Sequence, residues 1–62
     1  MAFSRRRAKE LRLVASDVPW ALGRGPEVRG PGEAILMALN GRAAALADLE
    51  GAGVPVLAGR MP

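Results

Sequence analysis

The stretch VRGPGEAILMALNGR, residues 28–42, has the pattern of a glycine-bracketed turn that leads into a short apolar helix. Pro31 suits the first position of that helix, since its φ is preset and the amide hydrogen that it lacks would be unpaired there. Gly30 is then the N-cap, and Glu33 places a negative charge in the first turn, where the helix dipole favours it. The pattern predicts a helix that begins at Pro31.

The apolar residues of this helix give it one side for packing. Ile35, Leu36 and Leu39 are spaced i, i+1 and i+4, which lines one face of a helix. Asn40-Gly41 then supplies a left-handed C-terminal stop. We expect the helix to end there and to use these three side chains for contacts.

Upstream of this stretch, the sequence has the period of β-strands. Residues 11–16 alternate from one face to the other, and residues 18–22 alternate again. Pro19 cannot donate a ladder hydrogen bond, so the second strand should be short or at an edge. Residues 27–29 are long enough for a third short strand.

Downstream, residues 42–50 predict a second helix with leucines at i and i+3, and Pro55 opens a final helical turn. This order of elements predicts an α+β fold: a small antiparallel sheet of two or three short strands followed by two or three short helices. We assign residues 10–62 to this single small domain and residues 1–9 to a basic N-terminal arm.

The composition leaves this domain with a thin core. The chain has 62 residues, no cysteine, no histidine and two aromatic residues, Phe3 and Trp20. A domain of this size buries only about 60% of the surface of its unfolded chain, so disulfides, metals or partners usually add stability. Without thiolate or imidazole ligands we expect no metal site and no cofactor on this chain. We therefore expect a homodimer or a complex with another protein.

The residues that we expect at such an interface are the large apolar side chains of the second strand and the helix. They form more apolar surface than the short second helix can cover, and an exposed patch of that kind usually marks an interface. The predicted interface residues are Val18, Trp20, Leu22, Ile35, Leu36 and Leu39.

The chain carries eight arginines, one lysine and a net charge of +3, with the cations concentrated near the N-terminus. Clustered arginines contact phosphates without reading sequence, so we expect at most weak binding of nucleic acid at physiological salt. The residues predicted to contact an anion or nucleic acid are Arg5, Arg6, Arg7, Lys9, Arg12 and Arg29. No apolar run approaches the ~20 residues of a membrane span, and no signal peptide is visible, so we expect a cytoplasmic protein and no membrane contact.

The glycines do not form a known phosphate-binding loop. A dinucleotide fingerprint that starts at Gly23 needs glycine where Val28 stands, and a Walker-type loop that ends at Gly30 needs Lys where Pro31 stands. The only hydroxyl groups belong to Ser4 and Ser16, and neither has a base beside it. We therefore predict no catalytic residues, expect no autonomous activity, and interpret the glycines as packing geometry.

Nearly the whole chain, residues 5–61, resembles the C-terminal domain of the mycothiol-dependent maleylpyruvate isomerase family. The similar pieces occur in the order that the family has them. They are Leu11-Arg12-Leu13-Val14-Ala15-Ser16-Asp17, Trp20, Gly25-Pro26-Glu27-Val28-Arg29-Gly30-Pro31, Asn40-Gly41-Arg42 followed by alanines, and Gly53-Val54-Pro55.

The resemblance implies a small α+β domain related in shape to sterol-carrier-like folds. In the family this domain follows a four-helix DinB-like bundle that holds a divalent metal and much of the mycothiol pocket, and this chain has no such bundle. The resemblance thus implies a non-catalytic accessory or interaction domain, with metal and mycothiol on a separate domain. The alternatives are a subunit of a split mycothiol-dependent enzyme and a small nucleic-acid-binding protein that uses the basic arm.

Overall fold

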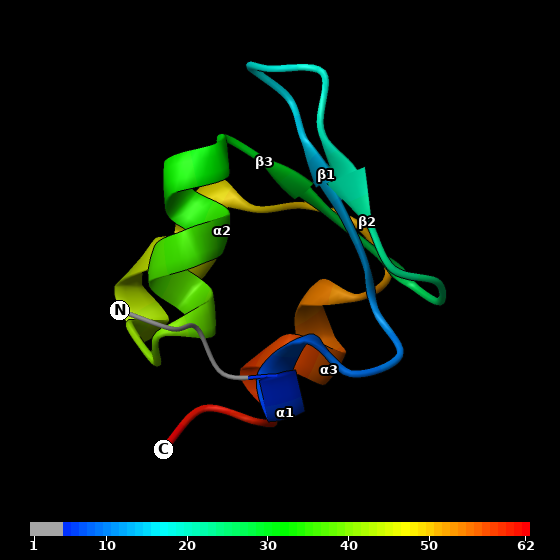
Figure 1. Cartoon of the computed structure of the whole chain (residues 1–62). Coiled ribbons are helices and arrows are strands. Elements are labelled where there is room, and N and C mark those ends of the chain that lie inside the picture. The colour runs from blue at the N-terminus through cyan, green and yellow to red at the C-terminus, as the bar shows by residue number, and fades with distance from the viewer. Residues whose placement is uncertain (1–4) are drawn as a thin grey trace.

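The computed structural model describes residues 5–62 and has the α+β class that the sequence predicts. Three short strands form one sheet, and helical segments precede and follow it (Figure 1). The elements in order are α1 (Arg5–Ala8), β1 (Arg12–Ala15), β2 (Ala21–Leu22), β3 (Glu27–Gly30), α2 (Gly32–Leu39), the 3-10 helix η1 (Ala43–Asp48) and α3 (Val54–Ala58).

The sheet has the strand order β2-β1-β3 and mixed strand directions. β1 and β2 are antiparallel, as the sequence predicts, and Leu13 lies opposite Leu22. β3, in contrast, runs parallel to β1, with Leu13 beside Val28, so the expected antiparallel arrangement holds for one strand pair only. The cause is the connection from β2 to β3, residues 23–26, which passes the start of β1 and delivers the chain to its other edge.

The crossing requires two glycines. Gly23 and Gly25 have φ values of +88° and +128°, and a Cβ at either position would collide with the backbone carbonyl oxygen of Leu11 or Glu10. After the crossing, the Arg12 amide donates to the Pro26 carbonyl at 3.0 Å. The backbone of residues 23–26 therefore lies directly against the start of β1.

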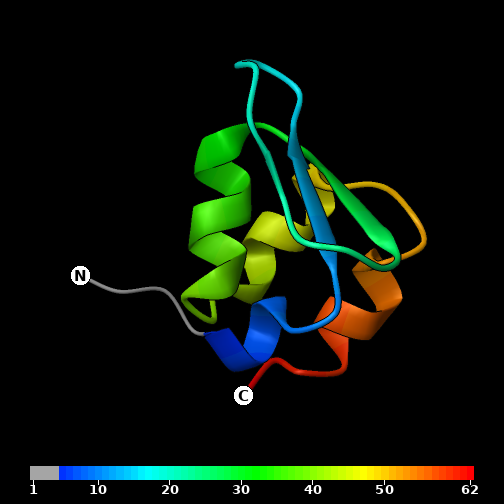
Figure 2. The same cartoon turned by 45° about the vertical axis from the view of Figure 1, so that its right-hand side comes forward.

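The core lies on one side of the sheet, where α2, η1 and α3 pack (Figure 1, Figure 2). Ile35 and Leu39 are fully buried there, whereas Leu36 is 49% exposed, which corrects the predicted packing face of α2. The buried face of α2 includes Ala34 and Ala38, whose small side chains let the helix approach the sheet closely. The core residues are Leu11, Leu13, Val28, Ala34, Ile35, Ala38, Leu39, Ala45, Leu49 and Leu57.

The predicted start of α2 is one residue too early. Gly30 is still part of β3, where its carbonyl accepts from the Ser16 amide at 2.8 Å, so it cannot be the N-cap. Pro31 takes that place with an extended ψ of 139°, and its carbonyl accepts the first helical hydrogen bond, from Ile35, at 3.1 Å. Gly41 ends the helix with a φ of +91°, as predicted.

The second predicted helix is a 3-10 helix, and a length argument explains why. η1 returns along α2, whose eight residues span about 12 Å at ~1.5 Å per residue. The six residues of η1 cover about the same distance only at the ~2.0 Å rise of a 3-10 helix. The chain then becomes extended, and Glu50 forms a bridge with Arg29 at the outer edge of β3.

The described part of the predicted basic arm is folded onto the domain. Residues 5–8 form α1, beside the C-terminal end of α2, where Arg7 Nη1 donates to the Leu39 carbonyl at 3.2 Å. Residues 1–4 of the arm lie outside the described residues. The arm and the domain predicted from the sequence are thus one packed unit from residue 5 onward.

Candidate protein-interaction surface

The hairpin of β1 and β2 brings Trp20 to the same face of the sheet as the core. The Ala15 amide donates to the Trp20 carbonyl at 2.9 Å, so these two residues lie opposite each other. Opposed residues of antiparallel strands share a face, and Ala15 is buried on the core side. Trp20 and Leu22 therefore continue the apolar face of the sheet toward its β2 edge, where they are 40% and 48% exposed.

A shallow apolar recess separates this edge of the sheet from α2. We call it the Trp20 groove and define it by Ala15, Val18, Trp20, Gly32 and Leu36, which line it. Its volume is about 290 Å³, at the lower limit of the ~300–1,000 Å³ typical of small-molecule pockets. An open recess of this size suits a few side chains of a partner protein better than an enclosed ligand.

Asp17 ties the two walls of the groove together. Its Oδ1 accepts from the Gly32 amide, at the N-terminus of α2, at 3.0 Å. In the same bend, the Trp20 amide donates to the Val18 carbonyl at 2.8 Å. The carboxylate interacts favourably with the positive end of the helix dipole, so the hairpin is held over the first turn of α2. An anion from within the chain thus already occupies this helix terminus.

The structure divides the predicted interface residues into two groups. Val18, Trp20, Leu22 and Leu36 are exposed at or beside the Trp20 groove. Ile35 and Leu39, in contrast, are fully buried in the core, so they are not available for an interface. The sequence pattern did not indicate Ala15 and Gly32, because small residues in a groove carry no apolar signal of their own.

The predicted anion-contacting residues do not form one patch. Arg12 Nη1 donates to the Gly23 carbonyl at 3.2 Å, and Arg29 Nε pairs with Glu27 Oε2 at 3.0 Å on the outer face of the sheet. Within residues 5–62, Arg5, Arg6 and Lys9 have no side-chain hydrogen bond or ion pair. Among the predicted residues, the cations that remain available are therefore Arg5, Arg6 and Lys9.

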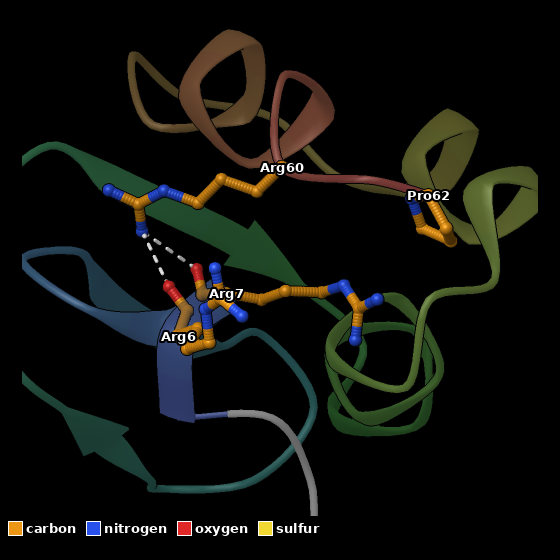
Figure 3. Close-up of a pocket in the computed structure, with 4 residues that line it drawn as sticks. All are labelled: Arg6, Arg7, Arg60 and Pro62. Atoms are coloured by element: carbon orange, nitrogen blue, oxygen red, sulfur yellow. Dashed lines mark hydrogen bonds between the residues drawn. The ribbon is translucent and has the colours of Figure 1, made fainter.

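A second recess, lined by Arg6, Arg7, Arg60 and Pro62, lies at the α1 end of the molecule (Figure 3). Arg60 Nη1 donates to the carbonyls of Arg6, Arg7 and Lys9 at 3.3, 2.9 and 2.6 Å. One guanidinium thus satisfies the carbonyls that end α1. The sequence pattern did not indicate Arg60, because more than fifty positions separate it from α1.

The residues that the structure describes contain no cluster of side chains that could hold a metal ion. Within residues 5–62 no three acidic side chains are grouped as ligands, and the chain has no histidine or cysteine. No helix in that range is both long and apolar enough to cross a membrane. The Trp20 groove is lined by apolar residues and a glycine, and it presents side chains for contact rather than groups for catalysis.

No family model, curated protein or solved structure matches the chain. The resemblance to the C-terminal domain of mycothiol-dependent maleylpyruvate isomerases therefore stays a prediction from the sequence. The candidate site is accordingly defined by geometry: an apolar groove with one wall from a hairpin and the other from α2.

Proposed function

We propose that this chain is a non-catalytic protein-interaction module that binds its partner through the Trp20 groove. The observation that carries the proposal is the exposure of Val18, Trp20 and Leu36 around one recess beside the buried core. Tryptophan is among the residues that contribute most to binding at protein interfaces.

The geometry of the groove supports this function. Both walls are fixed, one by the pairing of β2 with β1 and the other by the burial of Ile35 and Leu39 beneath α2. A partner therefore meets an apolar surface that needs little ordering on binding, which lowers the entropic cost of association. Burial of partly exposed large side chains supplies about 25 cal/mol per Å² of apolar area.

The test is photo-crosslinking in the cells that produce the protein. A photoreactive residue replaces Leu36 in the groove or, as a matched control, Val56, which is 39% exposed on α3. We expect adducts from position 36 that the added substitution Trp20→Asp removes, and far fewer adducts from position 56. Equal labelling from both positions would contradict the proposal.

The resemblance to mycothiol-dependent enzymes leads to a more specific form of this proposal, a split enzyme. In a split enzyme, the partner at the groove is a separate four-helix bundle that supplies the metal and the mycothiol pocket. The crosslinked partner then contains histidine and glutamate metal ligands, and the two chains together have activity that neither has alone. A partner without such ligands would exclude the split enzyme, but it would still support the proposal that the chain is a protein-interaction module.

The second candidate function is nucleic-acid binding by α1, favoured by the available side chains of Arg5, Arg6 and Lys9. Three phosphate contacts give a log–log salt slope of about −2.7 on duplex DNA, and we expect weak binding at physiological salt. Fluorescence anisotropy with unrelated DNA sequences at several salt concentrations measures the affinity and the salt slope. Submicromolar binding at physiological salt that Arg5→Ala, Arg6→Ala and Lys9→Ala together abolish would rank this function first.

A further inference from the structure

The charges beside the Trp20 groove indicate the chemistry of its partner. Resting on the proposed function, we infer that the groove binds a basic amphipathic segment of another protein. An apolar side chain of that segment enters the groove, and a lysine or arginine within one helical turn of it contacts the carboxylates beside the groove.

Each wall of the groove carries one charged side chain, and both of these are carboxylates. In residues 13–23, which form the hairpin wall, the charged residue is Asp17, and in residues 30–41, which include α2, it is Glu33. Neither range contains a lysine or an arginine. The walls are therefore negative, although the chain as a whole carries a net charge of +3.

Both carboxylates lie beside the groove. Asp17 Oδ1 accepts from the amide of Gly32, a residue that lines the groove, at 3.0 Å. Glu33 follows Gly32 and precedes Leu36 by three residues, so the side chains of Glu33 and Leu36 are neighbours on the surface of α2. Asp48 lines a neighbouring recess together with Glu33, so η1 adds a third carboxylate at the same end of α2. A segment that fills the groove therefore comes close to negative charge on both walls.

The two wall carboxylates keep acceptor capacity for a ligand. Within residues 5–62, Asp17 Oδ2 accepts no hydrogen bond, and the Glu33 carboxylate takes part in no hydrogen bond or ion pair. A carboxylate can accept about four hydrogen bonds, so Asp17 can bind a partner's cation and still accept from Gly32. Hydrogen bonds from an ammonium or guanidinium group to a carboxylate are charge-assisted and therefore stronger than neutral ones.

The cations of the chain that the structure places lie away from the groove. Arg29 pairs with Glu27 on the outer face of the sheet, whereas Trp20 lies on the core face. Arg7 donates to the carbonyl of Leu39, the last residue of α2, and thereby holds α1 at the other end of that helix. Figure 1 shows α1 and the loop between β1 and β2 at opposite ends of the molecule, with the length of α2 between them. The negative charge beside the groove is therefore available to a partner.

This charge distinguishes between classes of partner. An acidic segment would bring like charges together, and an uncharged apolar segment would leave both carboxylates without a counter-charge. A basic segment gains at both carboxylates. Its cation can also stack on the ring of Trp20, which is 40% exposed and attracts cations through its quadrupole. The observations therefore favour a basic partner with an apolar anchor.

The test uses random linear peptides that are displayed on phage and selected against the full chain. We expect the selected peptides to carry a large apolar residue with lysine or arginine within one helical turn, and to bind more weakly as the salt concentration rises. Leu36→Ser should reduce their affinity at least about tenfold, as measured by fluorescence anisotropy of the labelled synthetic peptides. The Leu36 side chain is 49% exposed, so this variant should keep its fold, which circular dichroism checks.

The contribution of charge is tested at position 33. Glu33→Lys should bind the selected basic peptides about tenfold more weakly, because repulsion replaces attraction. A peptide in which glutamate replaces the basic residue should then bind Glu33→Lys better than it binds the natural chain. Glu50→Lys makes the same charge change at the β3 edge and should leave the affinity within about twofold.

Selected peptides that depend on Leu36 but carry no basic residue, or that bind Glu33→Lys unchanged, would overturn the inference and leave the proposed function standing. Peptides that bind Leu36→Ser as tightly as the natural chain, or a selection that enriches none, would also overturn it. So would crosslinks from position 36 to another copy of this chain, because the occupant would then be a second copy. The proposed function is decided separately, by whether position 36 gives adducts that position 56 does not.

Discussion

Two glycines in the loop between β2 and β3 allow the chain to pass the start of β1. At Gly25 the φ of +128° lies where other residues are strained, and the Glu10 carbonyl oxygen occupies the space of a Cβ. The sequence correctly predicts a turn here, since glycine and proline mark turns. It does not predict the direction of β3, because that depends on which edge of β1 the loop reaches, a contact between segments rather than a property of the loop.

Gly25→Ala should therefore destabilise the fold by about 2–4 kcal/mol, from strain at positive φ together with the clash against the Glu10 carbonyl. Gly59→Ala is the matched control, because its new Cβ would meet its nearest atom at 3.5 Å and its φ is −67°. Urea unfolding followed by circular dichroism measures both. Similar midpoints for the two variants would show that the crossing tolerates a side chain.

Asp17 is the residue on which the shape of the groove depends, since its carboxylate joins the hairpin bend to α2. We expect Asp17→Ala to lower the free energy of unfolding by about 1 kcal/mol, the usual loss for a helix N-terminal acceptor. Asp17→Asn keeps an acceptor oxygen and should lose less. Trp20 fluorescence should shift to the red in the alanine variant, because the released bend exposes the indole; an unchanged spectrum would argue against this role for Asp17.

At the level of elements, local patterns are enough to predict the position of α2 but not its rotation against the sheet. The proline–glycine start and the Asn40-Gly41 stop are local signals, and they place the helix to within one residue. The rotation of α2 is not local: burial of Ala34 and Ala38 against the sheet turns Leu36 outward. For the same reason Leu36 remains accessible for the predicted interface, whereas Ile35 and Leu39 face the core and are not accessible for it.

The helix α1 depends on an equally distant contact, the capping of its carbonyls by Arg60. Arg60→Ala should lower stability by about 1–2 kcal/mol, because three carbonyls lose a charged donor. Hydrogen exchange should quicken at the Leu11 amide, which donates to Ala8 at 3.2 Å. Arg42→Ala, at an exposed position between α2 and η1, is the control and should change neither the stability nor the exchange rate of the Leu11 amide. An unaltered exchange rate at Leu11 in Arg60→Ala would contradict the capping role of Arg60.

At the scale of the whole molecule, a small core and an open apolar face have the same origin. α2 packs against β1 and β3, and the β2 edge of the sheet carries apolar side chains that are 40–48% exposed. The composition alone indicates this shortage of core, since a chain of 62 residues has little to pack with. It does not indicate the separation of charge along α2, which arises only when η1 and α1 fold back to opposite ends of that helix.

If a second copy covers this face, stability must depend on concentration, because association stabilises only the folded chain. For a dimer of this size that unfolds to two chains, the thermal midpoint should rise by about 5 °C for each tenfold increase in concentration. Leu36→Ser should abolish this dependence while it changes the midpoint at low concentration little, because the side chain is half exposed in the monomer. Val56→Ser, on α3 and away from the groove, should retain it. Scanning calorimetry over a hundredfold concentration range measures the slope, and a midpoint independent of concentration in the natural chain would show that a second copy does not cover the open face.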